Sequence, residues 1–160
     1  MTDIAATRAG ILGRIAEAAA RSGRDAAAVE IVAITKTVPA DRIRAAYGAG
    51  FRAFGENRVQ ERQAKAAELE AAIAPADEAP RWHLVGPLQS NKSRRAIELF
   101  DVIETVDSVG LAQRLDRLAS EARPGRSHPV LLQVNVDADA AKSGFEPATL
   151  EGIIRSLVQR

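Results

Sequence analysis

The sequence contains no cysteine, which excludes disulfide bonds, thiolate metal sites and cysteine nucleophiles. Its only histidines are His83 and His128, so a zinc site would depend on carboxylate ligands. No ligand spacing typical of zinc is present. Aromatic residues are also scarce, at 4% of the chain, and the alanine that replaces them suits helices that pack closely on a sheet.

An excess of one charge and long apolar runs are missing as well. The 22 basic and 21 acidic residues leave a formal net charge of +1, which provides no overall field for nucleic acid or an anionic membrane. No apolar run approaches the length of a membrane span. The amino terminus is rich in Ala and Arg, but Asp3 and Glu17 interrupt it, and it lacks the apolar stretch of a signal peptide. We therefore expect a cytoplasmic protein that binds neither nucleic acid nor membrane.

Hydrophobic patterning predicts an amino-terminal helix followed by repeated strand–helix units. Ile4, Ile11, Leu12 and Ile15 fall on one face of the first helix. Apolar runs bounded by turn signals then predict strands, each followed by a helical pattern. The predicted strands cover residues 30–35, 52–55, 82–85, 101–106 and 130–136; the helices after them cover residues 39–47, 57–73, 90–100, 108 to just before Pro124, and 147–158, with Ser90 and Ser108 as N-caps and a loop at 75–80.

Five strand–helix units in succession predict parallel pairing with right-handed crossovers. Two architectures fit this pattern, an open doubly wound sheet and a (β/α)8 barrel. The first strand is followed by Thr35-Lys36-Thr37-Val38-Pro39 instead of the Gly-rich turn of a dinucleotide site, which disfavours the doubly wound fold. A barrel needs eight units and typically about 250 residues. On this interpretation the 160-residue chain is an α/β domain with only the first five units of a (β/α)8 TIM-type barrel.

Lys36 is the first candidate for chemistry because it follows the apolar run at residues 31–35. A lysine at the carboxyl end of a buried strand lies where α/β folds place their active sites. Partial desolvation there would lower the pKa of the amine and make it a Schiff-base nucleophile. The alternative is an ordinary solvated lysine at a strand end.

Other polar residues follow later strands toward the same edge of the predicted sheet. Asn57 comes after the second strand, His83 lies in the third, residues 86–92 follow it, and residues 135–144 follow the fifth. Asn57 and His83 can hydrogen-bond a ligand, and the amides before the third helix can hold an anion. Each has a structural interpretation too: Asn57 as a helix cap, His83 as a core histidine bonded to backbone, and Lys92 as a solvated helix residue.

Several motifs together identify a family. The chain resembles the pyridoxal phosphate homeostasis proteins, a family that is itself similar to the amino-terminal barrel domain of alanine racemase. The resemblance runs from about residue 4 to the last residue, and Arg58 replaces an aromatic residue usual in the family. The motifs that carry it are IVAITKTVP, FGENRVQE, WHLVGPLQSNK, VDS at 106–108, LLQVNVD and KSGF.

The resemblance implies a (β/α)8 barrel that binds pyridoxal 5′-phosphate as an aldimine with Lys36. It also implies that Asn57 and His83 line the cofactor site and that Lys142 is an accessory lysine in cofactor transfer. By analogy the protein buffers or delivers the cofactor without catalysing a reaction of its own. Its partners would be the cofactor and apo pyridoxal phosphate enzymes, and the full-length form would be a monomer.

The same resemblance predicts that the family continues for about three more strand–helix units, which carry its phosphate-binding loops. On this basis we expect residues 1–160, the amino-terminal portion of a single alanine racemase-like barrel domain, to bind the cofactor poorly, or to aggregate, when studied alone. Two alternatives remain. One is a pyridoxal phosphate-dependent amino-acid racemase, which needs a second acid or base near the substrate. The other is a Schiff-base lysine aldolase, which needs no cofactor.

Overall fold

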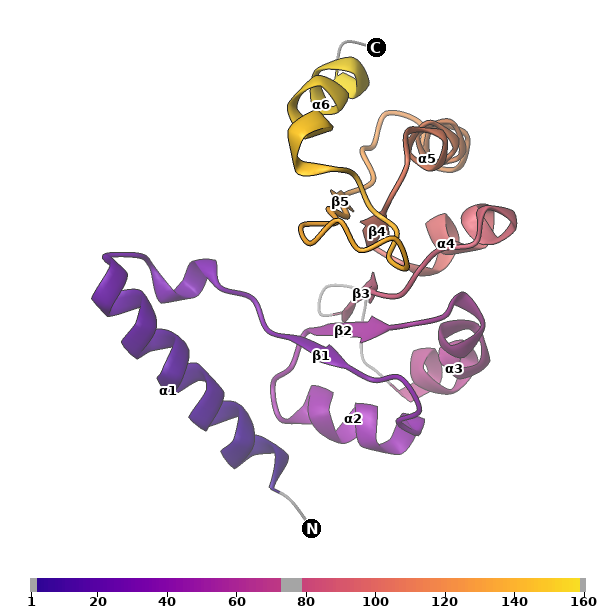
Figure 1. The fold of residues 1–160 in the computed structure, drawn as a ribbon. Coiled ribbons are helices and arrows are strands. Elements are labelled where there is room, and N and C mark those ends of the chain that lie inside the picture. The colour runs from indigo at the N-terminus through magenta and orange to yellow at the C-terminus, as the bar shows by residue number, and fades with distance from the viewer. Residues whose placement is uncertain (1–2, 73–78, 159–160) are drawn as a thin grey trace.

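Five parallel strands form the sheet of the computed structural model, which describes residues 3–72 and 79–158. Each strand pairs in parallel with the next one along the chain, so the order in the sheet is β1-β2-β3-β4-β5. Figure 1 shows the strands side by side in an arc. Their bounds are β1 (Val32–Ile34), β2 (Ala53–Glu56), β3 (Arg81–Leu84), β4 (Val102–Val106) and β5 (Val130–Leu132).

The sequential strand order distinguishes the two predicted architectures. A doubly wound sheet reverses its order at a switch point, whereas a (β/α)8 barrel adds each strand beside the previous one. The helices between the strands lie along the outer side of the arc (Figure 1), which confirms the prediction of a partial barrel. The elements that follow the strands are α2 (Ala40–Gly48), α3 (Val59–Ala72), the 3-10 turn η3 (Ser90–Lys92), α4 (Ser93–Leu99), α5 (Val109–Ala122), the 3-10 turn η4 (Pro147–Thr149) and α6 (Leu150–Val158).

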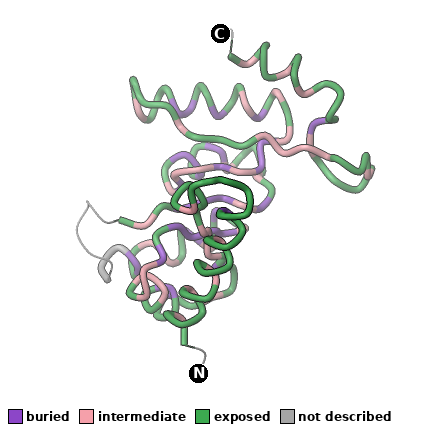
Figure 2. The backbone as a smooth tube through the Cα atoms, turned by 90° about the vertical axis from the view of Figure 1, so that its left-hand side faces the viewer, coloured by how far each residue is buried: buried purple, intermediate pink, exposed green. Residues whose placement is uncertain are grey.

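The helix α1 (Ile4–Ser22) and the short 3-10 turn η1 (Ala26–Ala28) precede the sheet. The carboxylate of Asp3 accepts hydrogen bonds from Ala5 N and Ala6 N and so caps the start of α1. The helix ends at Gly23, whose φ of 65° is the left-handed conformation common after a helix. In Figure 2, the helices nearest the two ends of the chain are largely exposed.

The core lies between the sheet and its outer helices. The rings of Phe54 and Trp82 lie 5.5 Å apart, and these two residues are paired in register on β2 and β3. Because side chains alternate along a strand, the neighbouring register pair, Gly55 and His83, belongs to the opposite, concave face. Fully buried side chains contributed to the core by the outer helices include Ile43, Leu69, Ala96 and Ile97.

The fifth strand is shorter than predicted, so the predicted strand at 130–136 is wrong beyond Leu132. Asn135 Nδ2 donates to the main-chain oxygens of Asp139 at 2.9 Å and Lys142 at 3.2 Å. These bonds turn the chain into a closed loop, and Val134 then forms a parallel bridge with Phe145. A polar side chain that bonds to nearby backbone competes with the strand ladder.

The helix boundaries follow the prediction with two differences, at Ser90 and at the helix predicted for 147–158, whose first three residues form the 3-10 turn η4 before α6 begins at Leu150. Ser108 caps α5 as expected, since its Oγ accepts from Leu111 N at 3.3 Å. Ser90 was expected to be the N-cap of a helix from 90 to 100, but it begins η3, and α4 starts at Ser93. The predicted loop at 75–80 lies mostly outside the described residues, and the helix predicted for 57–73 is α3, Val59–Ala72. Within the described chain, no helix has both the length and the apolar character needed to cross a membrane.

Candidate functional site

Lys36 lies in a turn that directly follows β1. The strand pairing continues for one residue, because Thr35 N donates to Gly55 O at 2.8 Å. Val38 N then donates back to Thr35 O at 3.0 Å and closes the turn, while Thr37 adopts a φ of 61°. Lys36 is exposed, so the desolvation expected from the sequence to activate its amine is absent from this structure.

Lys36 follows the β1 residues that line the concave face of the sheet. A Cβ atom added to Gly55 would lie 2.8 Å from Ile34 Cδ1 and 3.3 Å from Val32 Cγ1, so these two β1 side chains cover Gly55 on that face. Lys36 is two residues beyond Ile34, in the turn that follows the strand. Ile34 itself is 50% exposed, which leaves this face open beside the lysine.

His83 is buried on the same face, with only 6% of its side chain exposed. Its Nδ1 lies 2.7 Å from Glu104 Oε1 on β4. Its Nε2 is buried and has no hydrogen-bond partner in the described residues. The structural interpretation of His83 as a core histidine bonded to backbone is therefore wrong, since its partner is a carboxylate. An unsatisfied buried ring nitrogen is costly to leave unpaired, and it is the kind of atom that a ligand satisfies.

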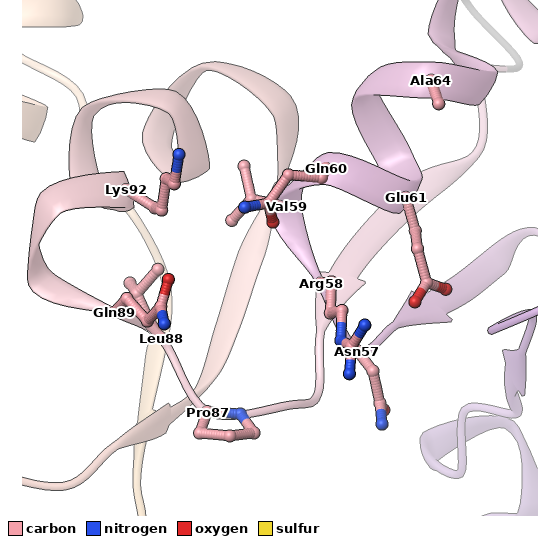
Figure 3. A pocket seen from close by; sticks show the side chains of 10 residues that line it. All are labelled: Asn57, Arg58, Val59, Gln60, Glu61, Ala64, Pro87, Leu88, Gln89 and Lys92. Atoms are coloured by element: carbon pink, nitrogen blue, oxygen red, sulfur yellow. The ribbon is translucent and has the colours of Figure 1, made fainter.

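Asn57 lines a pocket of about 890 Å³ at the carboxyl ends of β2 and β3. Figure 3 shows Asn57 and Arg58 on one side of this pocket and Leu88 and Gln89 on the other. The two walls meet at Gly86, where an added Cβ would lie only 2.3 Å from Asn57 O. The complete lining is Asn57, Arg58, Val59, Gln60, Glu61, Ala64, Pro87, Leu88, Gln89 and Lys92.

The three residues predicted for the site thus lie on or after neighbouring strands, but the structure does not join them directly. No hydrogen bond or ion pair links any two of Lys36, Asn57 and His83 in the described part of the chain. Asn57 lines the pocket, whereas Lys36 and His83 do not. The connection to Lys36 runs through Glu61, which lines the pocket and whose Oε2 accepts from Thr37 N at 3.4 Å.

A second pocket, of about 470 Å³, opens beside the loop after β5. Lys142 lines it, with 61% of its side chain exposed and its Nζ 3.6 Å from a carboxylate oxygen of both Asp137 and Asp139. Pro87 and Val85 extend its lining toward β3. The residues after the third and fifth strands therefore come together at one edge of the sheet, as predicted.

Sequence reasoning missed a buried ionic group beneath Lys36. Glu56 is completely buried, and its Oε1 accepts from Thr35 Oγ1 at 2.8 Å and from Lys65 Nζ at 2.7 Å. Lys65 also donates to Thr35 O at 2.9 Å. The available signal was a pair of charged residues at positions 56 and 65, one at a strand end and one in the helix that follows. Among the described residues, no group of three or more His, Asp or Glu side chains could hold a metal ion.

Comparison with known proteins gives the same family at the levels of sequence and structure. The family model of the alanine racemase N-terminal domain matches residues 12–160. The chain is 44% identical to the pyridoxal phosphate homeostasis protein of Pseudomonas aeruginosa and 38% identical to that of Escherichia coli K12, over 161 residues in each case. These matches include 99% of the chain but only 66% of each relative.

Solved structures agree. PipY of Synechococcus elongatus PCC7942, solved without and with PLP (pyridoxal phosphate), is 46% identical over 91% of this chain and 64% of its own, with TM-scores of 0.74 and 0.70. Alanine racemase of Clostridium difficile 630, at 15% identity and a TM-score of 0.59 over 82% of this chain and 32% of its own, shares the fold. The resemblance seen in the motifs is confirmed, and the chain belongs to the family of the alanine racemase N-terminal domain.

Proposed function

We propose that this chain belongs to a pyridoxal 5′-phosphate-binding protein of intracellular cofactor homeostasis, which holds the cofactor on Lys36 as an aldimine. The observation that carries the proposal is the exposed Lys36 at the carboxyl edge of β1, in a sheet whose concave face also holds the unsatisfied Nε2 of His83. The sequence identity of 44% to a pyridoxal phosphate homeostasis protein and of 46% to PipY, which has been solved with PLP bound, supports this choice of ligand.

The cofactor would supply an aldehyde, with which the amine of Lys36 could condense with loss of water, and a second amine could reverse the resulting C=N bond. For such an exchange the lysine must be reachable by both the incoming aldehyde and the competing amine. The exposure of Lys36 supports this use. The reversible bond also explains how one residue can both store the cofactor and release it.

His83 and Asn57 would orient the ligand. The Glu104 carboxylate accepts a hydrogen bond from Nδ1 of His83 and so fixes the orientation of the ring. The buried Nε2 is then left to form a hydrogen bond with a polar group of the ligand. Asn57 is half-buried in the pocket wall and offers both an amide donor and an amide acceptor. These hydrogen-bonding groups of His83 and Asn57 fit a polar aromatic aldehyde.

The curated relatives, which are pyridoxal phosphate homeostasis proteins, favour a carrier over the two catalytic alternatives. A racemase would need an acid or base placed against the substrate on the side opposite the lysine. An aldolase would use its lysine without a bound cofactor, whereas the relative PipY has been solved with PLP. Recipient enzymes, the accessory role of Lys142 and the cytoplasmic location stay predictions.

The proposal is tested by visible absorption of the full-length protein titrated with pyridoxal 5′-phosphate. We expect an imine band that the Lys36→Met variant lacks and the matched Lys142→Met variant keeps. An undiminished band in Lys36→Met would contradict the assignment. Two further assays separate the classes: steady racemisation of alanine or another amino acid indicates an enzyme, and a borohydride-trapped sugar phosphate without cofactor indicates an aldolase.

A further inference from the structure

Two residues of α3 hold the turn that carries Lys36. Lys65 Nζ donates to Thr35 O at 2.9 Å, and Glu61 Oε2 accepts from Thr37 N at 3.4 Å. Glu61 and Lys65 are four residues apart in α3, so they share one face of the helix. The main chain directly before and directly after Lys36 is therefore attached to a single helix face, whereas the Lys36 side chain is exposed.

Glu56 holds both Lys65 and Thr35 in place through hydrogen bonds to its buried carboxylate. Its carboxylate is 0% exposed and accepts from both Lys65 Nζ and Thr35 Oγ1, at 2.7 and 2.8 Å. A buried ion pair of this kind adds little net stability compared with well-packed apolar residues. Its role here is to fix the position of the Lys65 ammonium. That ammonium contacts both the Glu56 carboxylate on β2 and the carbonyl oxygen of Thr35, the residue before Lys36.

The turn needs such support because its backbone is strained. Thr37 has a φ of 61°, a left-handed conformation that is unusual for a β-branched residue. Strained residues of this type persist where their surroundings over-determine them, and they gather at functional sites. Without Lys65, Thr35 O would keep only the bond from Val38 N, at 3.0 Å, and the turn would lose its attachment to the residue before Lys36.

We propose that Glu56, Glu61 and Lys65, the Lys36 clamp, position the Lys36 amine for reaction with an aldehyde. This inference rests on the proposed function. The clamp residues are positioning residues: the Nζ atom of Lys65 is engaged by two acceptors, and Lys36 remains the nucleophile. Because small misplacements of reacting groups have large kinetic effects, loss of the clamp should slow imine formation at Lys36 roughly tenfold to a hundredfold.

The test compares four variants of the full-length protein with the wild type. Lys65→Met removes the ammonium but keeps the length of the side chain. Glu56→Gln combined with Lys65→Met removes both buried charges, so that no unpaired carboxylate prevents folding. Lys65→Arg is the conservative variant. Glu68→Gln is the matched control, since Glu68 is an exposed residue of the same helix.

Each protein is mixed with pyridoxal 5′-phosphate, quenched with borohydride at increasing times, and mapped by mass spectrometry. The rate of adduct formation at Lys36 is divided by the rate at exposed Lys142, so differences in cofactor concentration and in quenching cancel. Amide hydrogen exchange at Thr37 and Val38 is measured separately on the cofactor-free proteins.

We expect the Lys36 to Lys142 ratio to fall in Lys65→Met and in the double variant, to recover in part in Lys65→Arg, and to stay unchanged in Glu68→Gln. Exchange at Thr37 and Val38 should accelerate in the same two variants. An unchanged ratio, or unchanged exchange at these amides, overturns the proposal that the clamp positions Lys36. The proposed function still stands in that case, provided that the wild type forms an adduct on Lys36. Absence of any wild-type adduct on Lys36 overturns both.

Discussion

Replacing Gly86 by alanine should destabilise the protein, because the added methyl group would collide with the opposite wall of the pocket. The added Cβ would lie 2.3 Å from Asn57 O, 2.8 Å from Asn57 Cα and 2.9 Å from Asn57 C. Ordinary contacts between such atoms are about 3.5 Å, so the backbone of one loop must move by roughly 1 Å. All three contacts are with backbone, which no change of side-chain rotamer can relieve. Overpacking of this kind costs about 3 kcal/mol.

The assay is urea unfolding of wild type and Gly86→Ala, with Gly110→Ala as the matched control. A Cβ at Gly110, in the first turn of α5, meets nothing within 4 Å, and alanine there should stabilise the helix by up to about 1 kcal/mol. The same chemical change is thus expected to have opposite signs at the two positions. Equal free energies of unfolding for Gly86→Ala and wild type would refute the reasoning that Gly86 is required for the close approach of the loops.

Two further predictions concern regions away from Lys36. Burial is the largest cause that lowers the pKa of His128 below 6.5, followed by the charge of Arg123 and opposed by that of Asp101. The unfolded chain therefore binds more protons near this pH, so the neutral ring stabilises the fold fully above about pH 6.5 and this contribution is lost as pH falls through the folded-state pKa. The difference in unfolding free energy between wild type and His128→Asn should shrink from pH 7.5 to pH 5, and parallel curves would contradict this. Asn135→Ala removes bonds to Asp139 and Lys142 and should cost about 1–3 kcal/mol, with faster amide exchange at Asp139; unchanged exchange there would show that the side chain does not hold the loop.

The fold was largely predictable because its signals are local. Alternating strand and helix patterns, with a lysine turn where a dinucleotide fold has glycines, were enough to favour a barrel, and the sequential strand order agrees. The end of the fifth strand was not predictable from the apolar pattern at 130–136. It depends on the bonds that Asn135 makes to backbone four and seven residues further along, which a period-two pattern does not contain.

The site was predictable only in part. Strand ends and motifs identified Lys36, Asn57 and His83, but the exposure of Lys36 depends on its three-dimensional surroundings. The pairing of His83 with Glu104 depends on the register between two strands. The contact of Lys65 with Glu56 and Thr35 depends on how α3 is rotated against the sheet. A charged residue inside the strand at 101–106 was the available signal for Glu104.

We propose above that Lys36 binds the cofactor through its aldehyde. This proposal is tested most directly by saturating the full-length protein with pyridoxal 5′-phosphate, reducing it with borohydride, and locating the pyridoxyl group by mass mapping. We expect the group on Lys36, with modification of Lys65 strongly disfavoured because its ammonium is held by Glu56 and Thr35. A pyridoxyl group predominantly on another lysine, or none on Lys36, would contradict it.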